Sequence, residues 1–222
     1  IATGGRSREL PALKQDGKKI IGYREAMSLP DQPKSMIVVG SGAIGVEFGY
    51  FYNSFGTKVT IVEFLPRVVP VEDEDVSKEL EKSLKKNGVD IMVSSEVTSV
   101  DTSGNGVKAK VKTASGEVTL EADILLSAVG VAANIEGIGL EEMGIKTDKG
   151  RIVVDKYYQT NVPGIYSIGD CAPGQALAHV ASKEGIICAE SIAYSEKKYN
   201  HQPESLDYGN VPGCTYCSPE IA

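Results

Sequence analysis

A short glycine-rich segment, residues 40–45, constrains the fold of this chain more than any other feature. It reads Gly-Ser-Gly-Ala-Ile-Gly and directly follows the apolar run Met36–Val39. Residues 43–55 carry the pattern of a helix, which Gly56 closes, and a second apolar run occupies residues 58–63. Apolar run, glycine turn, helix and apolar run in close succession predict a βαβ unit whose two strands are parallel and buried.

The three glycines of this turn have separate physical roles. Gly40 allows the tight turn, Gly42 lets a pyrophosphate approach the backbone, and Gly45 lets the helix pack against the strand. The helix N-terminus offers free N–H groups and a partial positive charge to the phosphates. Glu63 ends the second strand 23 residues after Gly40, where its carboxylate can bind both ribose hydroxyls of NAD. An NAD site is therefore predicted; the alternatives are a turn that binds nothing and, because Arg67 follows closely, a site for NADP.

The next segments extend this unit into an α/β domain. Residues 73–88 combine acidic residues at the start, apolar residues at every fourth position and lysines near the end, which predicts an amphipathic helix matched to its dipole. Between residues 90 and 127 the pattern becomes one of strands, with apolar residues alternating with lysines over 107–112. We expect an antiparallel meander appended to the parallel sheet, with 124–126 returning as a buried strand.

A second feature typical of nucleotide binding lies in the C-terminal half. Residues 166–170 read Tyr-Ser-Ile-Gly-Asp and precede a long helix expected from 175 to about 197. The carboxylate of Asp170 can accept a hydrogen bond from a ligand hydroxyl, and the helix start can face an anionic ring system. An ordinary strand, turn and helix with an aspartate cap is an equal alternative. His179 at this helix start is expected to contact a ligand through its backbone, and His201 to be solvated.

The four cysteines do not form a pattern typical of secreted, disulfide-linked proteins, which favours a reducing, cytoplasmic setting. Cys214 and Cys217 form a C-x-x-C, but no second pair is present to complete a zinc site. They lie in a predicted strand between Pro212 and Pro219, where alternation sends the two thiols to opposite faces. We therefore expect two ordinary thiols; the alternative is a redox-active pair. Residues 151–154 and 164–168 predict further strands.

Composition excludes several classes of partner and bounds the number of domains. The chain has 222 residues, 41% of them hydrophobic, which suits one large or two modest domains. Its net charge is −7 with both signs mixed, which argues against nucleic acid and anionic membranes. No apolar run approaches the roughly 18 residues of a transmembrane helix. Residues 1–5 resemble the end of a strand and lack an initiator methionine, so we expect a fragment of a longer protein.

Together these motifs resemble the pyridine nucleotide-disulfide oxidoreductase family, and within it the dihydrolipoamide dehydrogenases. The resemblance extends over the whole chain, and its motifs are specific in combination. The segments that carry it are Ala2–Gly4, Ala26–Pro30, Gly40–Glu47, Val62–Glu63, Ser127–Gly130, Ser167–Asp170, Leu177–His179 and Val211–Pro212.

This resemblance implies an α/β architecture in which a Rossmann-like NAD-binding domain is inserted in a partial FAD-binding domain. Residues 1–13 would end the first half of the FAD domain, and 14–133 would form the NAD domain with its parallel sheet and meander. Residues 134–205 would form the second half of the FAD domain. Residues 206–222 would begin a truncated interface domain.

The resemblance also implies which residues contact each cofactor. Glu47 resembles an acid near the nicotinamide that pairs with a lysine beside the redox disulfide. The positions matching NAD contacts are Gly40, Ser41, Gly42, Ala43, Ile44, Gly45, Val46, Glu47, Glu63, Val97 and Gly130. The positions matching FAD contacts are Thr3, Gly4, Gly5, Asp170, Ala176, Leu177, Ala178 and His179.

The implied activity is oxidation of protein-bound dihydrolipoyl groups by NAD through FAD and a redox disulfide. The implied partners are lipoyl domains of 2-oxo acid dehydrogenase complexes, and the complete protein would be a homodimer. Val131 stands where the family often has arginine, and nothing in the sequence matches the family's first FAD glycine motif, its C-x4-C disulfide or its C-terminal His-Glu pair. We therefore expect this chain alone to be inactive. The alternatives are another disulfide reductase or transhydrogenase of the family, and a stand-alone NAD-binding module.

Overall fold

The computed structural model describes all 222 residues, which form two compact units. The larger unit comprises residues 7–130 together with 213–222, and the smaller unit comprises residues 1–6 and 131–212. None of the helices is both long enough and apolar enough to cross a membrane.

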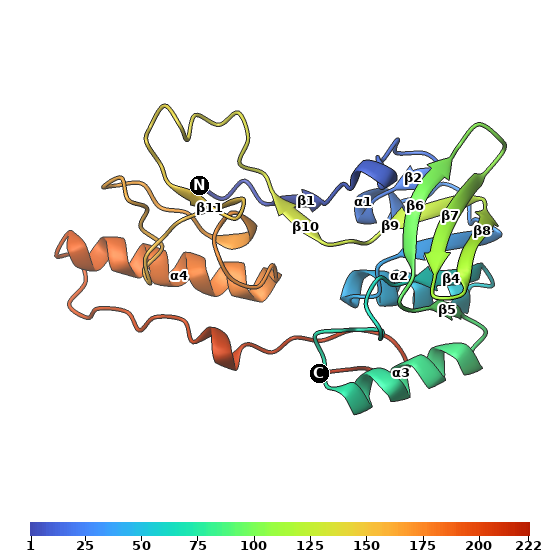
Figure 1. Cartoon of the computed structure of the whole chain (residues 1–222). Coiled ribbons are helices and arrows are strands. Elements are labelled where there is room, and N and C mark those ends of the chain that lie inside the picture. Colours follow the sequence, from blue (N-terminus) through green and yellow to red (C-terminus); the bar gives the residue numbers. More distant parts are fainter. The chain divides into compact units, whose positions relative to one another are not determined.

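The larger unit is built on a five-stranded parallel sheet with the strand order β2-β9-β3-β4-β5 (Figure 1). Helix α2 follows β3 and helix α3 follows β4, as the predicted βαβ unit requires. After β3 the chain adds β4 and β5 on one side, and later it adds β9 on the other side, between β3 and the earlier strand β2. The bounds are Ile20–Ile21 (β2), Ser35–Val39 (β3), Ala43–Ser54 (α2), Lys58–Val62 (β4), Glu74–Lys86 (α3), Asp90–Met92 (β5) and Ile124–Ser127 (β9).

The uninterrupted apolar runs in the sequence are explained by two hydrophobic layers, one on each face of this sheet. Met36 and Val38 of β3 pack with Leu80 and other helix residues on one face. Ile37 and its alternate neighbour Val39 pack against the antiparallel strands on the other face. Because successive side chains of a strand point to opposite faces, a sheet covered on both sides needs apolar residues at every position.

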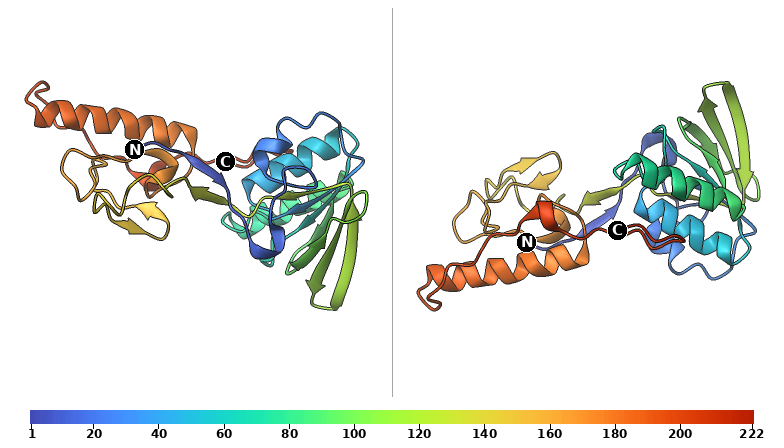
Figure 2. Two further views of the ribbon diagram at one scale, coloured as in Figure 1. Left: turned by 90° about the horizontal axis from the view of Figure 1, so that it is seen from above. Right: turned by 90° about the horizontal axis from the view of Figure 1, so that it is seen from below.

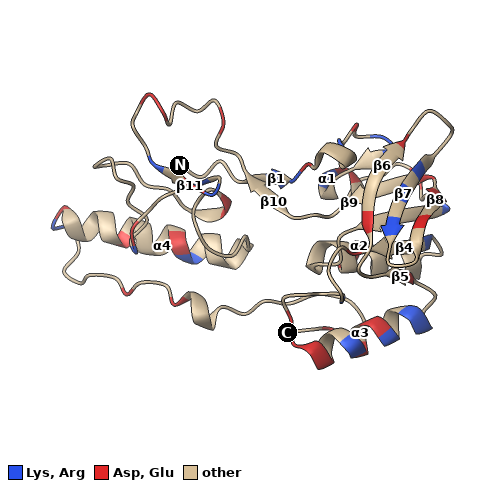
Figure 3. Cartoon of the chain, in the orientation of Figure 1, with Lys and Arg blue, Asp and Glu red and all other residues tan.

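The meander predicted between residues 90 and 127 forms a separate three-stranded antiparallel sheet, β6-β7-β8. Val107, Ala109 and Val111 are buried, whereas the alternating lysines face solvent and two of them pair with glutamates of β8 (Figure 3). The register places Val111 opposite Val97 and Val118. The strands span Glu96–Asp101 (β6), Val107–Thr113 (β7) and Gly116–Ala122 (β8).

Charge placement on α3 follows the sequence expectation. The side chain of Asp73 caps the helix by accepting from the backbone N–H of Asp75 at 2.8 Å. Acidic residues occupy the first turn, and Lys85 and Lys86 occupy the last turn (Figure 3). This arrangement matches the helix dipole and leaves the Leu80 and Leu84 side to pack on the sheet.

The smaller unit is dominated by the 18-residue helix α4, which both views of Figure 2 show as one uninterrupted helix beside the loops of residues 134–177. Its buried residues include Val180, Glu184, Ile187 and Cys188. The other elements of this unit are short. They are β1 (Gly5–Ser7) paired with β10 (Val131–Ala133), β11 (Thr147–Asp148) paired with β12 (Arg151–Ile152), and the 3-10 turns η2 (Gly169–Cys171) and η3 (Tyr208–Asn210); α4 spans Ala178–Ser195.

Two strand predictions in the smaller unit are wrong in part or in full. Of residues 151–154 only the first two form a strand with β11, although one further bond, from the N–H of Val153 to the carbonyl of Lys146 at 2.9 Å, follows the same register. Residues 164–168 form no strand. Only an isolated antiparallel bridge forms, between Tyr166 and Gln159, flanked by the bond from the N–H of Ser167 to Tyr158. The N–H of Ile168 bonds to Ile1 instead.

The predicted strand around the C-x-x-C is also wrong. Thr215 and Ile221 exchange hydrogen bonds of 2.8 and 3.2 Å, which folds residues 215–221 into a closed loop. Cys217 and Ile221 pack into the helix-side core of the larger unit. The two thiols nevertheless differ in surroundings: Cys214 is exposed and Cys217 is buried, and both are free.

The domain limits inferred from the resemblance differ in detail from the two observed units. The first segment of the larger unit begins at Ser7 instead of Lys14 and ends at Gly130 instead of Ala133. A second segment of this unit begins at Gly213. The assignment of residues 206–222 to a separate interface domain stays a prediction. Two short elements complete the larger unit, η1 (Pro11–Leu13) and α1 (Tyr23–Ala26).

Candidate cofactor sites

The glycine turn of residues 40–45 lies at the carboxyl end of β3, between that strand and α2. Strand β4, which follows β3 through α2, and strand β9, which comes later in the chain, lie on opposite sides of β3. In open parallel sheets, the crevice at such a reversal of strand order is where ligands bind. The turn therefore lies where proteins with this kind of sheet commonly bind a nucleotide.

Two of the three glycines are required by close contacts within the unit. Gly40 has a φ of +99°, and a Cβ placed on it would lie 2.4 Å from the carbonyl oxygen of Ala128. A Cβ on Gly45 would lie 1.9 Å from the carbonyl oxygen of Gly40. A Cβ on Gly42, in contrast, would meet no atom within 4 Å. The turn is thus closed on its inner side and open at the glycine expected to face the pyrophosphate.

The N-terminus of α2 has unused hydrogen-bonding capacity next to that open side. Gly42 is the N-cap and supplies no side-chain acceptor. The N–H of Val46 makes the first bond of the helix, to the carbonyl of Gly42 at 3.0 Å. The N–H groups of residues 43–45 therefore have no partner within the helix, and together with the helix dipole they suit an anionic phosphate.

Glu63 is buried, with 7% of its surface exposed, directly after β4. One carboxylate oxygen, Oε2, accepts hydrogen bonds from the backbone N–H of Ser41 at 2.7 Å and from its hydroxyl at 2.8 Å. The other, Oε1, accepts from the N–H of Leu65 at 2.8 Å. Because an ionised carboxylate has about four lone-pair positions, it retains acceptor capacity for ribose hydroxyls.

Arg67, the residue that left an NADP site open, makes its hydrogen bond elsewhere. Its Nη2 donates to the carbonyl of Pro70 at 3.1 Å. The acid bonded to the turn is Glu63, whose negative charge opposes a 2′-phosphate. This arrangement favours the reading of the site as one for NAD.

Glu47 lies on α2, one turn beyond the glycines, and its Oε1 accepts from the backbone N–H of Tyr216 at 2.8 Å. The segment that carries Tyr216 also contributes Cys217, whose pKa is raised to about 11, first by burial and then by the nearby charges of Glu47 and Glu220. Cys217 is therefore a protonated, unreactive thiol at neutral pH. The partner of Glu47 within this chain is a backbone amide.

The remaining positions matched to NAD lie in different surroundings. Val97 is buried in the core between the parallel sheet and the meander. Gly130 is exposed with a φ of +109°, and its carbonyl accepts from the N–H of Arg8 at 2.9 Å. Contact of these two residues with a nucleotide stays a prediction.

The residues matched to FAD in the first and second halves of the chain meet within the smaller unit. The hydroxyl of Thr3 donates to the carbonyl of Asn134 at 2.6 Å. A Cβ placed on Gly5 would lie 2.8 Å from Oδ2 of Asp170, so the strand around Gly4 passes closely by the aspartate. Segments separated by more than 160 residues of sequence are thereby brought to one place.

Like α2, helix α4 begins with backbone N–H groups that have no partner within the helix. Leu177 is the N-cap and the first helical bond runs from Ala181 to Leu177 at 3.0 Å, so residues 178–180 keep free N–H groups. Ala176 and His179 are exposed. Nε2 of His179 hydrogen-bonds to the carbonyl of Pro212 at 2.9 Å, which leaves a backbone role toward a ligand as the better interpretation.

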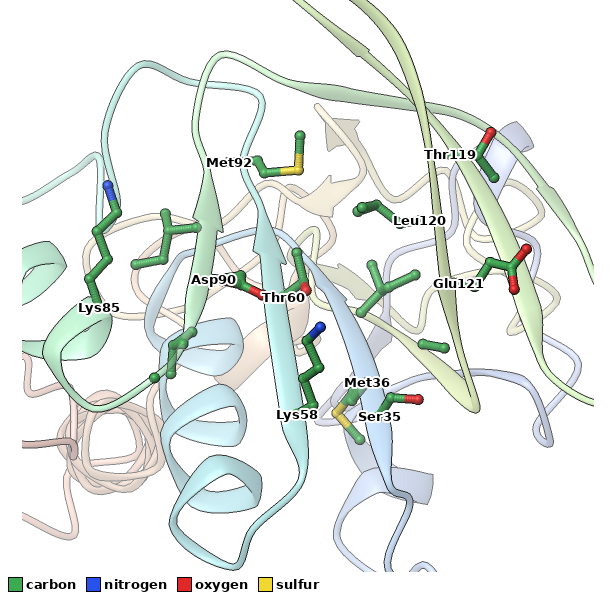
Figure 4. Close-up of a pocket in the computed structure, with 15 residues that line it drawn as sticks. Ser35, Met36, Lys58, Thr60, Lys85, Asp90, Met92, Thr119, Leu120 and Glu121 are labelled. Carbon is green, nitrogen blue, oxygen red and sulfur yellow. The ribbon is translucent and has the colours of Figure 1, made fainter.

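A cavity of about 620 Å³ opens elsewhere in the larger unit, between the parallel sheet and β8 (Figure 4). Ser35, Lys58 and Asp90 mark the amino ends of their strands, which is the sheet edge remote from the glycine turn. Two of its charged residues are already paired, Lys85 with Glu81 and Glu121 with Lys108. The cavity is therefore separate from the candidate site at the glycine turn.

Two contacts at the glycine turn were not anticipated from the sequence. The carbonyl of Ser41 accepts from the N–H of Val69 at 2.9 Å, and the Ser41 hydroxyl bonds to Glu63. Both rely on a residue at the variable second position of the motif. The sequence feature that could have indicated the bond to Glu63 is a serine, with its hydroxyl donor, at this position together with an acid at the end of the next strand.

Comparison with known proteins identifies the family. A sequence profile described as pyridine nucleotide-disulphide oxidoreductase matches residues 1–185, more than half of the chain. The chain belongs to this family. The observed sheet, meander and helix arrangement is an α/β fold shared with it, which confirms the predicted fold class.

Members of the family with curated names are similar over the whole chain. Dihydrolipoyl dehydrogenase of Rhizobium etli is 49% identical over 100% of this chain and 45% of its own length. Dihydrolipoyl dehydrogenase of Zymomonas mobilis is 44% identical over 100% of this chain and 47% of its own length. The chain therefore spans slightly under half the length of these oxidoreductase relatives.

Solved structures of the family superpose on the chain. LpdA from Mycobacterium tuberculosis has a TM-score of 0.86 at 33% identity, covering 99% of this chain and 46% of its own. RclA from Escherichia coli, a flavoprotein disulfide reductase, has a TM-score of 0.82 at 25% identity, covering 98% of this chain and 48% of its own.

Proposed function

We propose that this chain is the NAD-binding portion, with half of the FAD site, of a flavoprotein that oxidises protein-bound dihydrolipoyl groups. The observation that carries the proposal is the glycine turn, open at Gly42 and tied to the carboxylate of Glu63. Its support from relatives is the whole-chain similarity to dihydrolipoyl dehydrogenases. The overall reaction would convert a dithiol and NAD⁺ into a disulfide, NADH and a proton.

In the larger unit, the glycine turn, the start of α2 and Glu63 each have a defined part in this proposal. The free N–H groups of residues 43–45 bind the pyrophosphate, and Glu63 orients the adenosine ribose by accepting from its hydroxyls. Gly42 allows the backbone to come close to the phosphates. NAD supplies the hydride acceptor when bound; the chain's own residues bind and orient it.

In the smaller unit, Asp170 would accept from a hydroxyl of FAD, and residues 178–180 would direct their N–H groups at its anionic part. Gly4 and Gly5 would allow the close approach of the strand. The phosphate cradle that a dinucleotide needs is not matched by any second glycine turn in the sequence. We therefore assign half of an FAD site to this chain.

We further propose that the protein works as a homodimer with lipoyl domains of 2-oxo acid dehydrogenase complexes as partners. A cytoplasmic setting is consistent with four free cysteines. A second candidate activity is the reduction of another disulfide by a related flavoprotein, which the structural similarity to RclA favours.

Titration with NADH and NADPH, followed by nucleotide fluorescence, tests the proposal. We expect saturable binding of NADH and a preference over NADPH between fivefold and several hundredfold. Repulsion between two like charges about 4 Å apart amounts to roughly 1 kcal/mol in water and about 4 at an effective dielectric of 20. Equal affinities would remove Glu63 from its assigned role, and absence of binding would contradict the proposal itself.

A further inference from the structure

Glu184 is a buried carboxylate that belongs to none of the cofactor motifs. It lies in the second turn of α4, and 1% of its surface is exposed. Glutamate is almost never fully buried unless its charge has partners. Its hydrogen-bond partners are not its neighbours on the helix but come from elsewhere in the unit.

Two donors from distant parts of the sequence satisfy the two oxygens of Glu184. The backbone N–H of Gly169 donates to Oε2 at 2.6 Å. The hydroxyl of Tyr208 donates to Oε1 at 2.6 Å, and the hydroxyl of the buried Tyr158 lies 3.3 Å from that of Tyr208. One carboxylate thus joins η2, which carries Asp170, to η3, which lies in the segment leaving the unit.

The bond to Glu184 satisfies the N–H of Gly169, a residue whose carbonyl accepts from the N–H of Ala172 at 2.8 Å within the same turn. Gly169 has a φ of +70°, and a Cβ there would lie 3.4 Å from Cβ of Ala181. The turn therefore rests directly on α4, and its first N–H points at Glu184. The next residue, Asp170, passes close to Gly5, so a displacement of Gly169 would displace the aspartate from the strand that it faces.

The bond to Tyr208 holds the carboxylate of Glu184 in place. Burial, followed by the hydrogen bond to Glu184, raises the pKa of Tyr208 well above its ordinary value, so the phenol remains a donor. A charge-assisted hydrogen bond in a buried setting is about twice as strong as a neutral one. Loss of either partner leaves a buried polar group unsatisfied, which is more costly than the bond itself is stabilising.

We propose that Glu184 is the positioning residue of the flavin half-site: it fixes the Gly169–Asp170 turn and, through Tyr208, couples that turn to the segment of residues 206–210. This inference rests on the proposed function for the identity of the ligand. The geometry that carries it, two 2.6 Å bonds to one buried carboxylate, does not. Glu184 itself is not expected to touch the cofactor.

The test uses the ¹⁵N-labelled 222-residue chain with the variants Glu184→Gln and Tyr208→Phe, and Glu190→Gln on the same helix as the matched control. The amide proton signal of Gly169 reports the bond directly. We expect it to move upfield and to exchange about tenfold faster in Glu184→Gln. It should shift in Tyr208→Phe and stay unchanged in the control. Unmoved Gly169 signals in both variants would overturn the proposal.

A second measurement, quenching of flavin fluorescence on titration with FAD, separates the inference from the proposed function. We expect weak binding by the wild-type chain and a further weakening of about tenfold in Glu184→Gln. Binding of FAD that is equal in Glu184→Gln and in the control would overturn the inference alone. Gly169 signals that respond as expected in a chain with no affinity for FAD would support the positioning role and contradict the flavin assignment. If Glu184→Gln fails to fold by circular dichroism, Tyr208→Phe, which removes one hydroxyl, decides.

Discussion

The carboxylate of Glu63 accepts hydrogen bonds from both the backbone N–H and the hydroxyl of Ser41, at 2.7 and 2.8 Å. The strand-end acid is therefore bonded to the second residue of the glycine turn. The residue that would bind the ribose also holds in place the backbone that would bind the phosphates. A change at Glu63 should act on both parts of the nucleotide site.

Replacement of Glu63 by glutamine should reduce the preference for NADH over NADPH to less than about threefold. The neutral amide no longer repels a 2′-phosphate, and its oxygen still accepts from Ser41. Affinity for NADH should fall about tenfold, because charge-assisted bonds to the ribose are lost. Fluorescence titration with both nucleotides measures these changes, with the exposed Glu96→Gln as control. A variant that keeps the wild-type preference would show that another residue selects the cofactor.

Alanine at Gly45 should chiefly reduce stability, whereas alanine at Gly42 should chiefly reduce the affinity for NADH. Gly45→Ala places a Cβ 1.9 Å from the carbonyl oxygen of Gly40, so we expect a loss of roughly 1–3 kcal/mol or more in the free energy of unfolding. Gly42→Ala meets no protein atom within 4 Å and has an ordinary φ of −67°, so its stability should change by less than about 1 kcal/mol. Its affinity for NADH should nevertheless fall, since the methyl group occupies the open side of the turn.

Urea unfolding and NADH titration of both variants separate these outcomes. Wild-type affinity in Gly42→Ala would mean that the pyrophosphate does not approach this glycine. Wild-type stability in Gly45→Ala would mean that the turn can relax around an added methyl group.

The cysteines should differ sharply in reactivity. Cys214 is exposed, whereas Cys217 is buried and its pKa is raised to about 11, so at pH 8 only about one part in a thousand of Cys217 is thiolate. In the folded chain a thiol reagent should modify Cys214 first, and Cys214→Ser should remove that fast phase. Thiol counting before and after reduction should give equal values. An intramolecular disulfide between Cys214 and Cys217 would contradict the observed loop.

The ion pair of Arg6 with Glu136 predicts a specific dependence of stability on pH. The hydrogen bond from Arg6, at 2.7 Å, lowers the pKa of Glu136 to about 2, from 4.5. A carboxyl group with a lowered pKa in the folded state contributes stability above its unfolded pKa and loses it as pH falls through the folded one. Glu136→Gln should therefore flatten the decline in unfolding free energy between about pH 4.5 and pH 2.

Urea unfolding at several pH values measures this decline, with the exposed Glu141→Gln as control. Both side chains of the pair are largely exposed, so the effect should be small and should weaken with added salt. An identical decline in Glu136→Gln and in the control would show that the pair has no role in acid stability.

Features governed by local sequence could be predicted well. The role of Gly45, the helix that begins at Ala178 and the charge order on α3 depend on residues within a few positions of one another. The two-sided burial of the parallel strands also follows from their apolar runs alone. These elements include the parallel strands and the helices that follow them.

Features governed by distant partners could not be predicted. The backbone of residues 164–168 looked like a strand, but its hydrogen bonds go to Tyr158 and Ile1. The return of residues 213–222 to the larger unit depends on Cys217 and Ile221 finding its core, and Glu184 depends on donors 15 and 24 residues away. The apolar pattern of a segment indicates which of its residues are buried, but it does not show which distant residues they pack against or bond to.

This chain alone should bind NAD but should neither retain FAD through purification nor oxidise dihydrolipoamide. A dinucleotide needs its pyrophosphate held at a glycine turn and a helix N-terminus, and the G-x-G-x-x-G turn at residues 40–45 is tied to Glu63 and so to NAD. The half-site around Asp170 and residues 178–180 offers free N–H groups without such a cradle. The purified chain should therefore be colourless, and added FAD should bind only weakly.

Turnover should be absent for a separate reason. Disulfide chemistry needs a thiolate nucleophile that is activated by a nearby base. Cys171, Cys188 and Cys217 are buried, and the exposed Cys214 has no disulfide partner. Of the two histidines, His179 bonds to Pro212 and His201 is exposed. NADH formation from dihydrolipoamide and NAD⁺ should therefore equal that of a control without protein. A yellow preparation with bound flavin absorbance, or measurable turnover, would show that this sequence contains more of the catalytic machinery than its residues indicate.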